Sequence, residues 1–238
     1  MGFKSRFLYL AGLFSNALEE TIIPSRQAGW NINSGIRHAF GKMYYEERMI
    51  ELPFVFKCIR PPPASVLDIG CVESSLPVQL AMIDYNVTGI DIRDYCYRHM
   101  NLQFIKQDFI SYKFDRAFDC VTAISTIEHL GLKSYGQAKQ DINADKKAVQ
   151  KIASLLKPKG QFIFTAPYGL HDTIGTFERI YDENDIKNLF KHFKIQSKEF
   201  YKVVDRKAIK KVSQENLERL KHGETNSYGV ILVNAIKK

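Results

Sequence analysis

The sequence has little of what marks several common protein classes. Only four of its 238 residues are cysteine, and no apolar run approaches the roughly 18 to 20 residues that cross a bilayer. The cysteines show no C-x-x-C spacing and have no histidine nearby, so neither a zinc site nor a disulfide framework is indicated. This cysteine usage fits a reducing cytoplasm, and we predict no metal site.

Acidic residues are outnumbered by basic ones. The 34 Lys and Arg against 26 Asp and Glu give a formal net charge of +8, and much of the excess lies in residues 187–211. A basic surface is compatible with nucleic acid, anionic lipid or phosphate-bearing small molecules, and equally with a solvated face that has no partner. Charge alone therefore does not decide the function.

The chain divides at a run of three prolines, residues 61–63. Residues 1–60 are rich in aromatic and basic side chains and contain little strand signal. Each proline ring fixes φ and disfavours helix in the residue before it. We therefore predict a helical N-terminal cap over residues 1–60, which covers the substrate, and a main domain over residues 61–238.

After the prolines, short apolar runs alternate with helical patterns. The predicted strands cover residues 65–70, 87–90, 102–105, 118–124, 161–166, 194–204 and 228–236. The predicted helices cover residues 75–85, 141–156, 183–191 and 206–221, the last of them basic. This alternation predicts an α/β fold: a Rossmann-like, doubly wound, mostly parallel seven-stranded sheet.

Acidic residues stand at the ends of the first three predicted strands. Asp68 closes the first, Asp91 closes the second, and Asp108 lies just past the third. Ligands of such sheets bind outside the carboxyl ends of the strands, and Asp91 follows Gly70 by about the interval that places an acid on a ribose diol. Asp108 is positioned to accept a hydrogen bond from the adenine amino group. The acids therefore predict an adenosine pocket.

The glycine loop distinguishes between adenosine ligands. A dinucleotide site needs G-x-G-x-x-G, so that backbone amides approach a pyrophosphate. Here Val72 and Ser75 stand at the second and third glycine positions, and Glu73 would repel a pyrophosphate. S-adenosylmethionine carries a sulfonium cation and no phosphate, so the loop favours it over NAD.

Five further segments point the same way. They are residues 66–71, 89–91, 107–109, 118–121 and 155–160. In this order they resemble the successive motifs of the class I S-adenosylmethionine-dependent methyltransferases. The resemblance runs from about residue 64 to 170, and residues 229–233 fit the last antiparallel strand of that family. The chain departs from the family's glycine-rich loop at Val72 and Ser74.

The resemblance implies which residues bind the cofactor S-adenosyl-L-methionine. Asp68 and Gly70 would contact the methionine end, Asp91 the ribose and Asp108 the adenine. The segment 123–125 would lie beside the sulfonium. Ile92 or Phe109 would pack on the base. The predicted cofactor-binding residues are Asp68, Gly70, Cys71, Asp91, Ile92, Asp108, Phe109 and Ser125.

The segments 125–132 and 166–169 are similar to a methyltransferase subgroup associated with glycan and secondary-metabolite biosynthesis. The resemblance implies a small, sugar-like acceptor that is methylated on oxygen. A neutral hydroxyl attacks poorly without a base, and histidine is the usual base near pH 7. We predict His129 as this base, Glu128 as the residue that orients it, and His171 as a second group that faces the acceptor.

Other functions stay open from the sequence. Methylation of RNA or another nucleic acid would use the basic charge, although the residues after the fourth strand (123–126) contain no Asn/Asp-Pro-Pro motif. N-methylation of a small molecule is a further alternative, and so is a methyltransferase-like scaffold without activity. A divalent metal would need a third ligand besides Glu128 and His129, and the preceding turn offers only Ser125 and Thr126.

Overall fold

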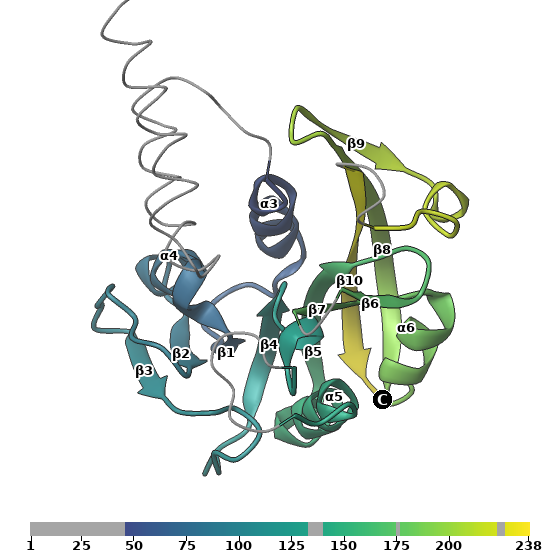
Figure 1. Cartoon of the computed structure of the whole chain (residues 1–238). Coiled ribbons are helices and arrows are strands. Elements are labelled where there is room, and N and C mark those ends of the chain that lie inside the picture. Colours follow the sequence, from purple (N-terminus) through teal and green to yellow (C-terminus); the bar gives the residue numbers. More distant parts are fainter. Residues whose placement is uncertain (1–45, 133–139, 175–176, 223–226) are drawn as a thin grey trace, which may run out of the picture. The chain divides into compact units, whose positions relative to one another are not determined.

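The computed structural model describes residues 46–132, 140–174, 177–222 and 227–238 (Figure 1). Residues 46–238 form one compact unit. Residues 1–45, with most of the predicted cap, lie outside the described residues, so the domain boundary predicted near residue 60 stays a prediction. Across the described ranges, no helix is both long and apolar enough to cross a bilayer.

The core of the fold is an eight-stranded sheet. Its strands are β1 (Ser65–Ile69), β2 (Asn86–Asp91), β3 (Leu102–Lys106), β4 (Phe118–Ile124), β5 (Leu156–Pro167), β8 (Phe193–Val204), β9 (Ala208–Val212) and β10 (Ser227–Lys237). They follow the order β3-β2-β1-β4-β5-β10-β8-β9. The first five are parallel, and β10, β8 and β9 pair antiparallel. The predicted α/β fold is confirmed, with one strand more than predicted.

Helices cover both faces of this sheet (Figure 1). The helices α3 (Arg48–Cys58) and α4 (Leu76–Met82) pack on one face, and α5 (Ala144–Leu155) and α6 (Glu183–Leu189) pack on the other. Strand β1 shows why its sequence is a continuous apolar run: Val66 packs with α3 and α4, whereas Leu67 packs with α5. Burial on both faces removes the polar alternation that a one-sided sheet would show.

The basic helix predicted over residues 206–221 is wrong. The segment instead forms strand β9 and a short 3₁₀ turn at Gln214–Asn216. Asp205 and Arg206 both have positive φ, at 50° and 52°, and Lys207 N donates to Val204 O at 2.8 Å. The turn between the paired residues Val204 and Ala208 has three residues, and its two left-handed ones reverse the chain so that β9 folds back along β8. Neither residue is glycine or asparagine, so the usual sequence signal of this turn is missing.

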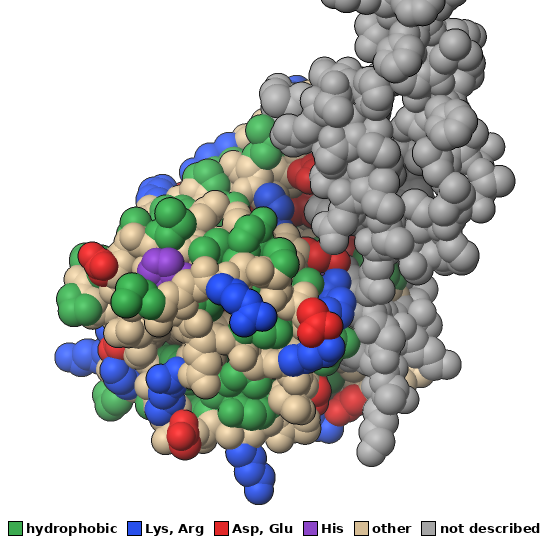
Figure 2. Space-filling view, turned by 90° about the vertical axis from the view of Figure 1, so that its left-hand side faces the viewer, with side chains coloured by type: hydrophobic (Ala, Val, Ile, Leu, Met, Phe, Trp, Pro, Cys, Tyr) green, Lys and Arg blue, Asp and Glu red, His purple; other side chains and the backbone are tan. Residues whose placement is uncertain are grey.

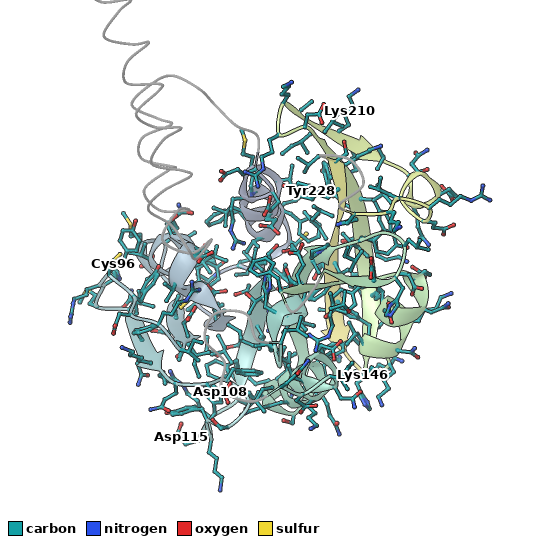
Figure 3. All side chains as sticks on the ribbon, viewed as in Figure 1. Cys96, Asp108, Asp115, Lys146, Lys210 and Tyr228 are labelled. Atoms are coloured by element: carbon teal, nitrogen blue, oxygen red, sulfur yellow. The ribbon has the colours of Figure 1, made fainter. Side chains whose placement is uncertain are left out.

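A second, small sheet lies in the segment that follows β5. It pairs β6 (Asp172–Ile174) antiparallel with β7 (Glu178–Ile180). Tyr228 of β10, labelled in Figure 3, donates a hydrogen bond to Glu47, just before α3, at 2.6 Å. The start of the described chain is therefore tied to the last strand.

Candidate functional site

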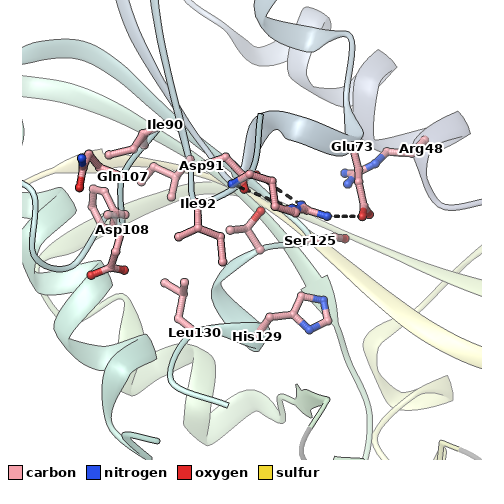
Figure 4. A pocket seen from close by; sticks show the side chains of 15 residues that line it. Arg48, Glu73, Ile90, Asp91, Ile92, Gln107, Asp108, Ser125, His129 and Leu130 are labelled. Atoms are coloured by element: carbon pink, nitrogen blue, oxygen red, sulfur yellow. Dashed lines mark hydrogen bonds and ion pairs between the residues drawn. The ribbon is translucent and has the colours of Figure 1, made fainter. Parts of the chain in front are cut away.

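A cavity of about 620 Å³, its open mouth included, lies at the carboxyl ends of β1, β2 and β4. Most of the predicted site residues line it: Gly70, Asp91, Ile92, Asp108, Phe109, Ser125 and His129. Figure 4 shows Asp108 and Gln107 at one end of the cavity and Glu73 and Arg48 at the other. The structure thus brings together predicted site residues that are spread along the chain from Gly70 to His129.

Gly70 makes the tight turn at the end of β1. Its φ of 73° lies in the left-handed region, and a Cβ atom there would lie 2.3 Å from the side chain of Thr126. Its amide donates to Ile90 O at 2.9 Å, which fixes the turn against β2. Only glycine meets both requirements, because it has no Cβ and tolerates positive φ.

Asp91 ends β2 and is 7% exposed. Its carboxylate accepts hydrogen bonds from Val72 N at 3.1 Å and from Arg93 N at 3.0 Å. The Arg93 guanidinium also contacts it and reaches the Glu73 carboxylate at 2.5 Å. Since Val72 N is bound to Asp91 and Glu73 lines the cavity, this loop presents a carboxylate where a dinucleotide site would present free amides.

Asp108 and Phe109 follow β3 at the far end of the cavity. Asp108 is exposed, and its carboxylate accepts from Ser111 N at 3.0 Å and Ile110 N at 3.3 Å. Phe109 is buried, and the Lys151 ammonium lies 5.0 Å from its ring centroid. The turn is therefore fixed on both sides, with a carboxylate and an aromatic ring at the cavity wall.

Ser125 directly follows β4 and has a left-handed conformation, with φ at 45°. Its Oγ donates to Glu51 Oε1 at 2.6 Å, and its amide donates to Thr165 O and Thr165 Oγ1. Thr165 Oγ1 also donates to Glu51, and Arg48 Nη1 donates to Glu51 Oε2 at 2.9 Å. We call Arg48, Glu51, Ser125 and Thr165 the inner network. It fixes a positive-φ residue that would otherwise be strained.

Glu51 is completely buried in the inner network. Burial raises the pKa of its carboxyl, and the Arg48 guanidinium opposes that shift. Arg48 also donates to Ile124 O at 3.2 Å and lines the cavity. The helix α3 thus supplies a paired charge to the end of β4, which lies more than 70 positions further along the chain.

His129 lies in the 3₁₀ turn Ile127–His129 that follows β4. Its Nδ1 lies 2.6 Å from Phe177 O, a contact that requires a proton on Nδ1 and leaves the lone pair on Nε2. Burial lowers the pKa of the imidazole to about 4. His129 is therefore neutral at pH 7 and able to accept a proton at Nε2.

Glu128, Asp68 and Cys71 do not line the cavity. Glu128 is 1% exposed, its Oε1 lies 3.9 Å from His129 Nε2, and its Oε2 has no hydrogen-bond partner among the described residues. Burial raises the pKa of Glu128. Asp68 accepts from Thr122 Oγ1 at 2.5 Å, and burial raises its pKa to about 7. Both acids lie behind the cavity wall, and at 3.9 Å Glu128 makes no hydrogen bond to orient His129.

Cys71 packs inward instead of facing the cavity. It is 1% exposed, and a Cβ atom added at Gly89 of β2 would lie 2.9 Å from its Sγ. Burial raises the pKa of this thiol. Among the predicted cofactor-binding residues, Cys71 is therefore positioned to shape the turn after Gly70 through packing.

His171 lies away from the residues that line the cavity. Its Nδ1 is 2.6 Å from Asp185 Oδ2, its side chain is 64% exposed, and the hydrogen bond to Asp185 raises its pKa. Ligand atoms of His171, Asp182 and Asp185 all lie within 4.8 Å of one another. Asp182 and Asp185 form the capping box of α6, which accounts for the acids without a metal.

Arg179 of β7 holds the turn that carries His129. It is 7% exposed, and its Nη1 donates to Glu128 O at 3.0 Å and to Leu130 O at 2.7 Å. The sequence predicted no role in the site for Arg48, Glu51 or Arg93. One signal was available: Arg48 and Glu51 stand three positions apart, a spacing that puts both on one helix face.

The chain has the fold of S-adenosylmethionine-dependent methyltransferases, which confirms the fold that its motifs imply. The 1,6-didemethyltoxoflavin-N1-methyltransferase of Burkholderia thailandensis is 14% identical, with a TM-score of 0.55, covering 91% of this chain and 93% of that chain. The N-methyltransferase NodS of Bradyrhizobium japonicum, solved with S-adenosyl-L-homocysteine, is 14% identical, with a TM-score of 0.53, covering 80% of this chain and 86% of that chain.

The [4+2]-cyclase SpnF is 16% identical with a TM-score of 0.57, covering 82% of this chain and 85% of that chain. Its name shows that this fold does not by itself fix the reaction. The chain belongs to the family described as "Caenorhabditis protein of unknown function, DUF268", whose model matches residues 78–234. No curated protein matches the sequence.

Proposed function

We propose that the protein transfers a methyl group from S-adenosyl-L-methionine to a hydroxyl of a small molecule. The acceptor we propose is a sugar, a glycan precursor or a secondary metabolite. The observation that carries the proposal is the row formed by the Gly70 turn, Asp91 and Asp108 at the carboxyl ends of the strands, with His129 lining the same cavity. This row offers carboxylates that can accept hydrogen bonds from an adenosine and that favour a neighbouring positive charge.

The residues of the cavity fit this donor. Asp91 would bind the ribose hydroxyls, Asp108 the adenine amino group, and Ile92 and Phe109 would pack on the base. The bound donor supplies an electrophilic methyl carbon on a sulfonium. Glu73 and Asp91 keep carboxylates in the cavity wall, which favours a cationic ligand over a pyrophosphate.

His129 would take the proton of the acceptor hydroxyl. Its Nδ1 donates to Phe177 O, which fixes the ring in the tautomer whose Nε2 carries no proton, and Nε2 would be the atom that takes the acceptor's proton. Arg179 would keep the turn in place through the carbonyls of Glu128 and Leu130. In-line transfer depends on such positioning, because the attacking oxygen, the methyl carbon and the sulfur have to be aligned.

N-methylation of a small molecule is the second candidate. The names of two similar structures, NodS and the toxoflavin enzyme, are those of N-methyltransferases. A nucleic-acid acceptor has less support. On the described part of the face in Figure 2, basic side chains are interspersed with hydrophobic and acidic ones. Separately, Lys57 and Lys211 both pair with Glu199. We place the reaction in the cytoplasm, in keeping with the free thiols of the four cysteines.

Calorimetric titration with S-adenosylhomocysteine tests the donor. Wild type should bind, and Asp91→Ala should bind at least about tenfold more weakly, since charge-assisted hydrogen bonds are lost. Asp115→Ala is the matched control, because Asp115 is exposed outside the cavity (Figure 3). Unchanged binding in Asp91→Ala, or none in wild type, would contradict the proposal.

Mass spectrometry tests the acceptor. Metabolite extracts incubated with the protein and a methyl-labelled donor should yield a labelled small molecule, and fragmentation should place the label on oxygen. A label on nitrogen would favour the second candidate. Labelled RNA with no labelled metabolite would overturn the small-molecule acceptor.

A further inference from the structure

The carboxylate of Asp91 is saturated with hydrogen bonds from its own chain. Oδ1 accepts from Arg93 N at 3.0 Å and from Arg93 Nε at 3.3 Å. Oδ2 accepts from Val72 N at 3.1 Å and from Arg93 Nη2 at 3.3 Å. A carboxylate offers about four lone-pair positions, so all of them are occupied. A ribose diol can bind Asp91 only if two of these donors leave.

The four donors differ in how easily they move. Val72 N belongs to the backbone of the 3₁₀ turn Cys71–Glu73, and Arg93 N to the backbone two positions after β2, so both are held by the fold. The Arg93 guanidinium ends a flexible side chain that is 29% exposed. It also has a second carboxylate within reach, because Nη1 lies 2.5 Å from Glu73 Oε1. A ligand can therefore displace the two guanidinium donors, Arg93 Nε and Nη2, from the carboxylate of Asp91.

We propose that the Arg93 guanidinium competes with the ribose for Asp91, and that Glu73 holds the guanidinium when a ribose diol displaces it from Asp91. This inference rests on the proposed function, in which Asp91 binds the ribose. The two hydroxyls of an unmodified ribose replace the two guanidinium donors, so Asp91 keeps four hydrogen bonds. A 2′-deoxyribose supplies one hydroxyl and leaves one position unfilled. The pair Arg93 and Glu73 thus selects a ribonucleoside and sets the affinity for it.

Calorimetric titration of two variants with S-adenosylhomocysteine tests the pair. Arg93→Ala removes the competitor and should bind about fivefold more tightly, which is the scale of a partly exposed ion pair. Glu73→Gln removes the second carboxylate, so the guanidinium stays on Asp91, and binding should weaken about fivefold. The matched control is Arg98→Ala, since Arg98 is exposed in the segment that follows β2, and its affinity should equal that of wild type.

The preference for adenosine over 2′-deoxyadenosine is a second measurement, and a purely structural role of Arg93 would not change it. The ratio of the dissociation constants of 2′-deoxyadenosine and adenosine should be larger in wild type than in Arg93→Ala. If Arg93→Ala is too unstable to titrate, Arg93→Lys replaces it. A lysine cannot span both oxygens of Asp91, so this variant should also bind more tightly than wild type.

The outcomes separate the two proposals. Binding that is lost in Asp91→Ala but unchanged in both Arg93→Ala and Glu73→Gln would overturn the competition proposed for Arg93. The same result would still support S-adenosyl-L-methionine as the methyl donor. Weaker binding in Arg93→Ala would also overturn the competition, because Arg93 would then be a ligand contact. Absence of binding in wild type and in every variant would overturn the proposed function itself.

Discussion

The two sides of the cavity are built in different ways. On one side, which we call the acid side, Asp91 and Asp108 accept hydrogen bonds from backbone amides no more than 19 positions away. On the opposite side, the inner network joins Glu51 to Ser125 and Thr165 across 74 and 114 positions. The acid side is thus a product of local turns, whereas the inner network exists only when α3, β4 and β5 have packed together. Substitutions should therefore affect binding on the first side and folding on the second.

The largest expected effect is that of Glu51→Ala. Removing one partner of a buried ion pair typically costs about 3–5 kcal/mol, and here it also removes the acceptor of two hydroxyl groups. The free energy of unfolding, measured by urea denaturation, should fall by about this amount. Glu51→Gln keeps an acceptor oxygen and should cost less. Equal free energies of unfolding for Glu51→Ala and wild type would contradict the claim that the inner network stabilises the fold.

His129→Ala tests the turn that lies between the two sides. Loss of a general base lowers kcat by about 10²- to 10⁴-fold, and the affinity for S-adenosylhomocysteine should stay the same. Single-turnover rates at saturating acceptor measure the effect. The control is His192→Ala, since His192 is exposed after α6. A near-normal rate in His129→Ala would remove the base assignment.

The pH dependence sharpens the assignment of His129. Because burial lowers its pKa to about 4, the activity should stay level between pH 7 and 5 and fall only near pH 4. The unfolded chain binds this proton near its ordinary pKa of 6.5, so the free energy of unfolding should fall as the pH drops from about 6.5 to 4. His129→Gln should lose this part of the slope. An acid limb of activity near pH 6.5 would contradict the burial of the imidazole.

The smallest effect is expected for His171→Ala. His171 is exposed and pairs with Asp185 at the start of α6, outside both sides of the cavity. Stability should fall by less than about 1 kcal/mol, as for other exposed pairs, and kcat and donor affinity should not change. A loss of activity on the scale of His129→Ala would show that His171 reaches the acceptor.

Local signals explain which parts of this molecule were predictable. Apolar runs with acids at or just past their ends predicted β1, β2 and β3 and three acids, of which Asp91 and Asp108 line the cavity. The inner network was missed because nothing near Glu51 in the sequence indicates a partner at Thr165. The hairpin at Asp205 was missed because its positive φ values carry no glycine. Contacts between distant segments, and unusual turns in ordinary residues, are what a single sequence does not reveal.

The helix α3 has a practical consequence for any shortened version of the protein. A fragment that begins at the prolines would lack Phe54 and Val55, which are buried against the sheet, as well as the carboxylate that receives the hydroxyls of Ser125 and Thr165. Such a truncation would expose apolar surface of the sheet, and the residue after β4 would lose its hydrogen bond to Glu51. Recombinant fragments intended for crystals or titrations should therefore start ahead of Glu46.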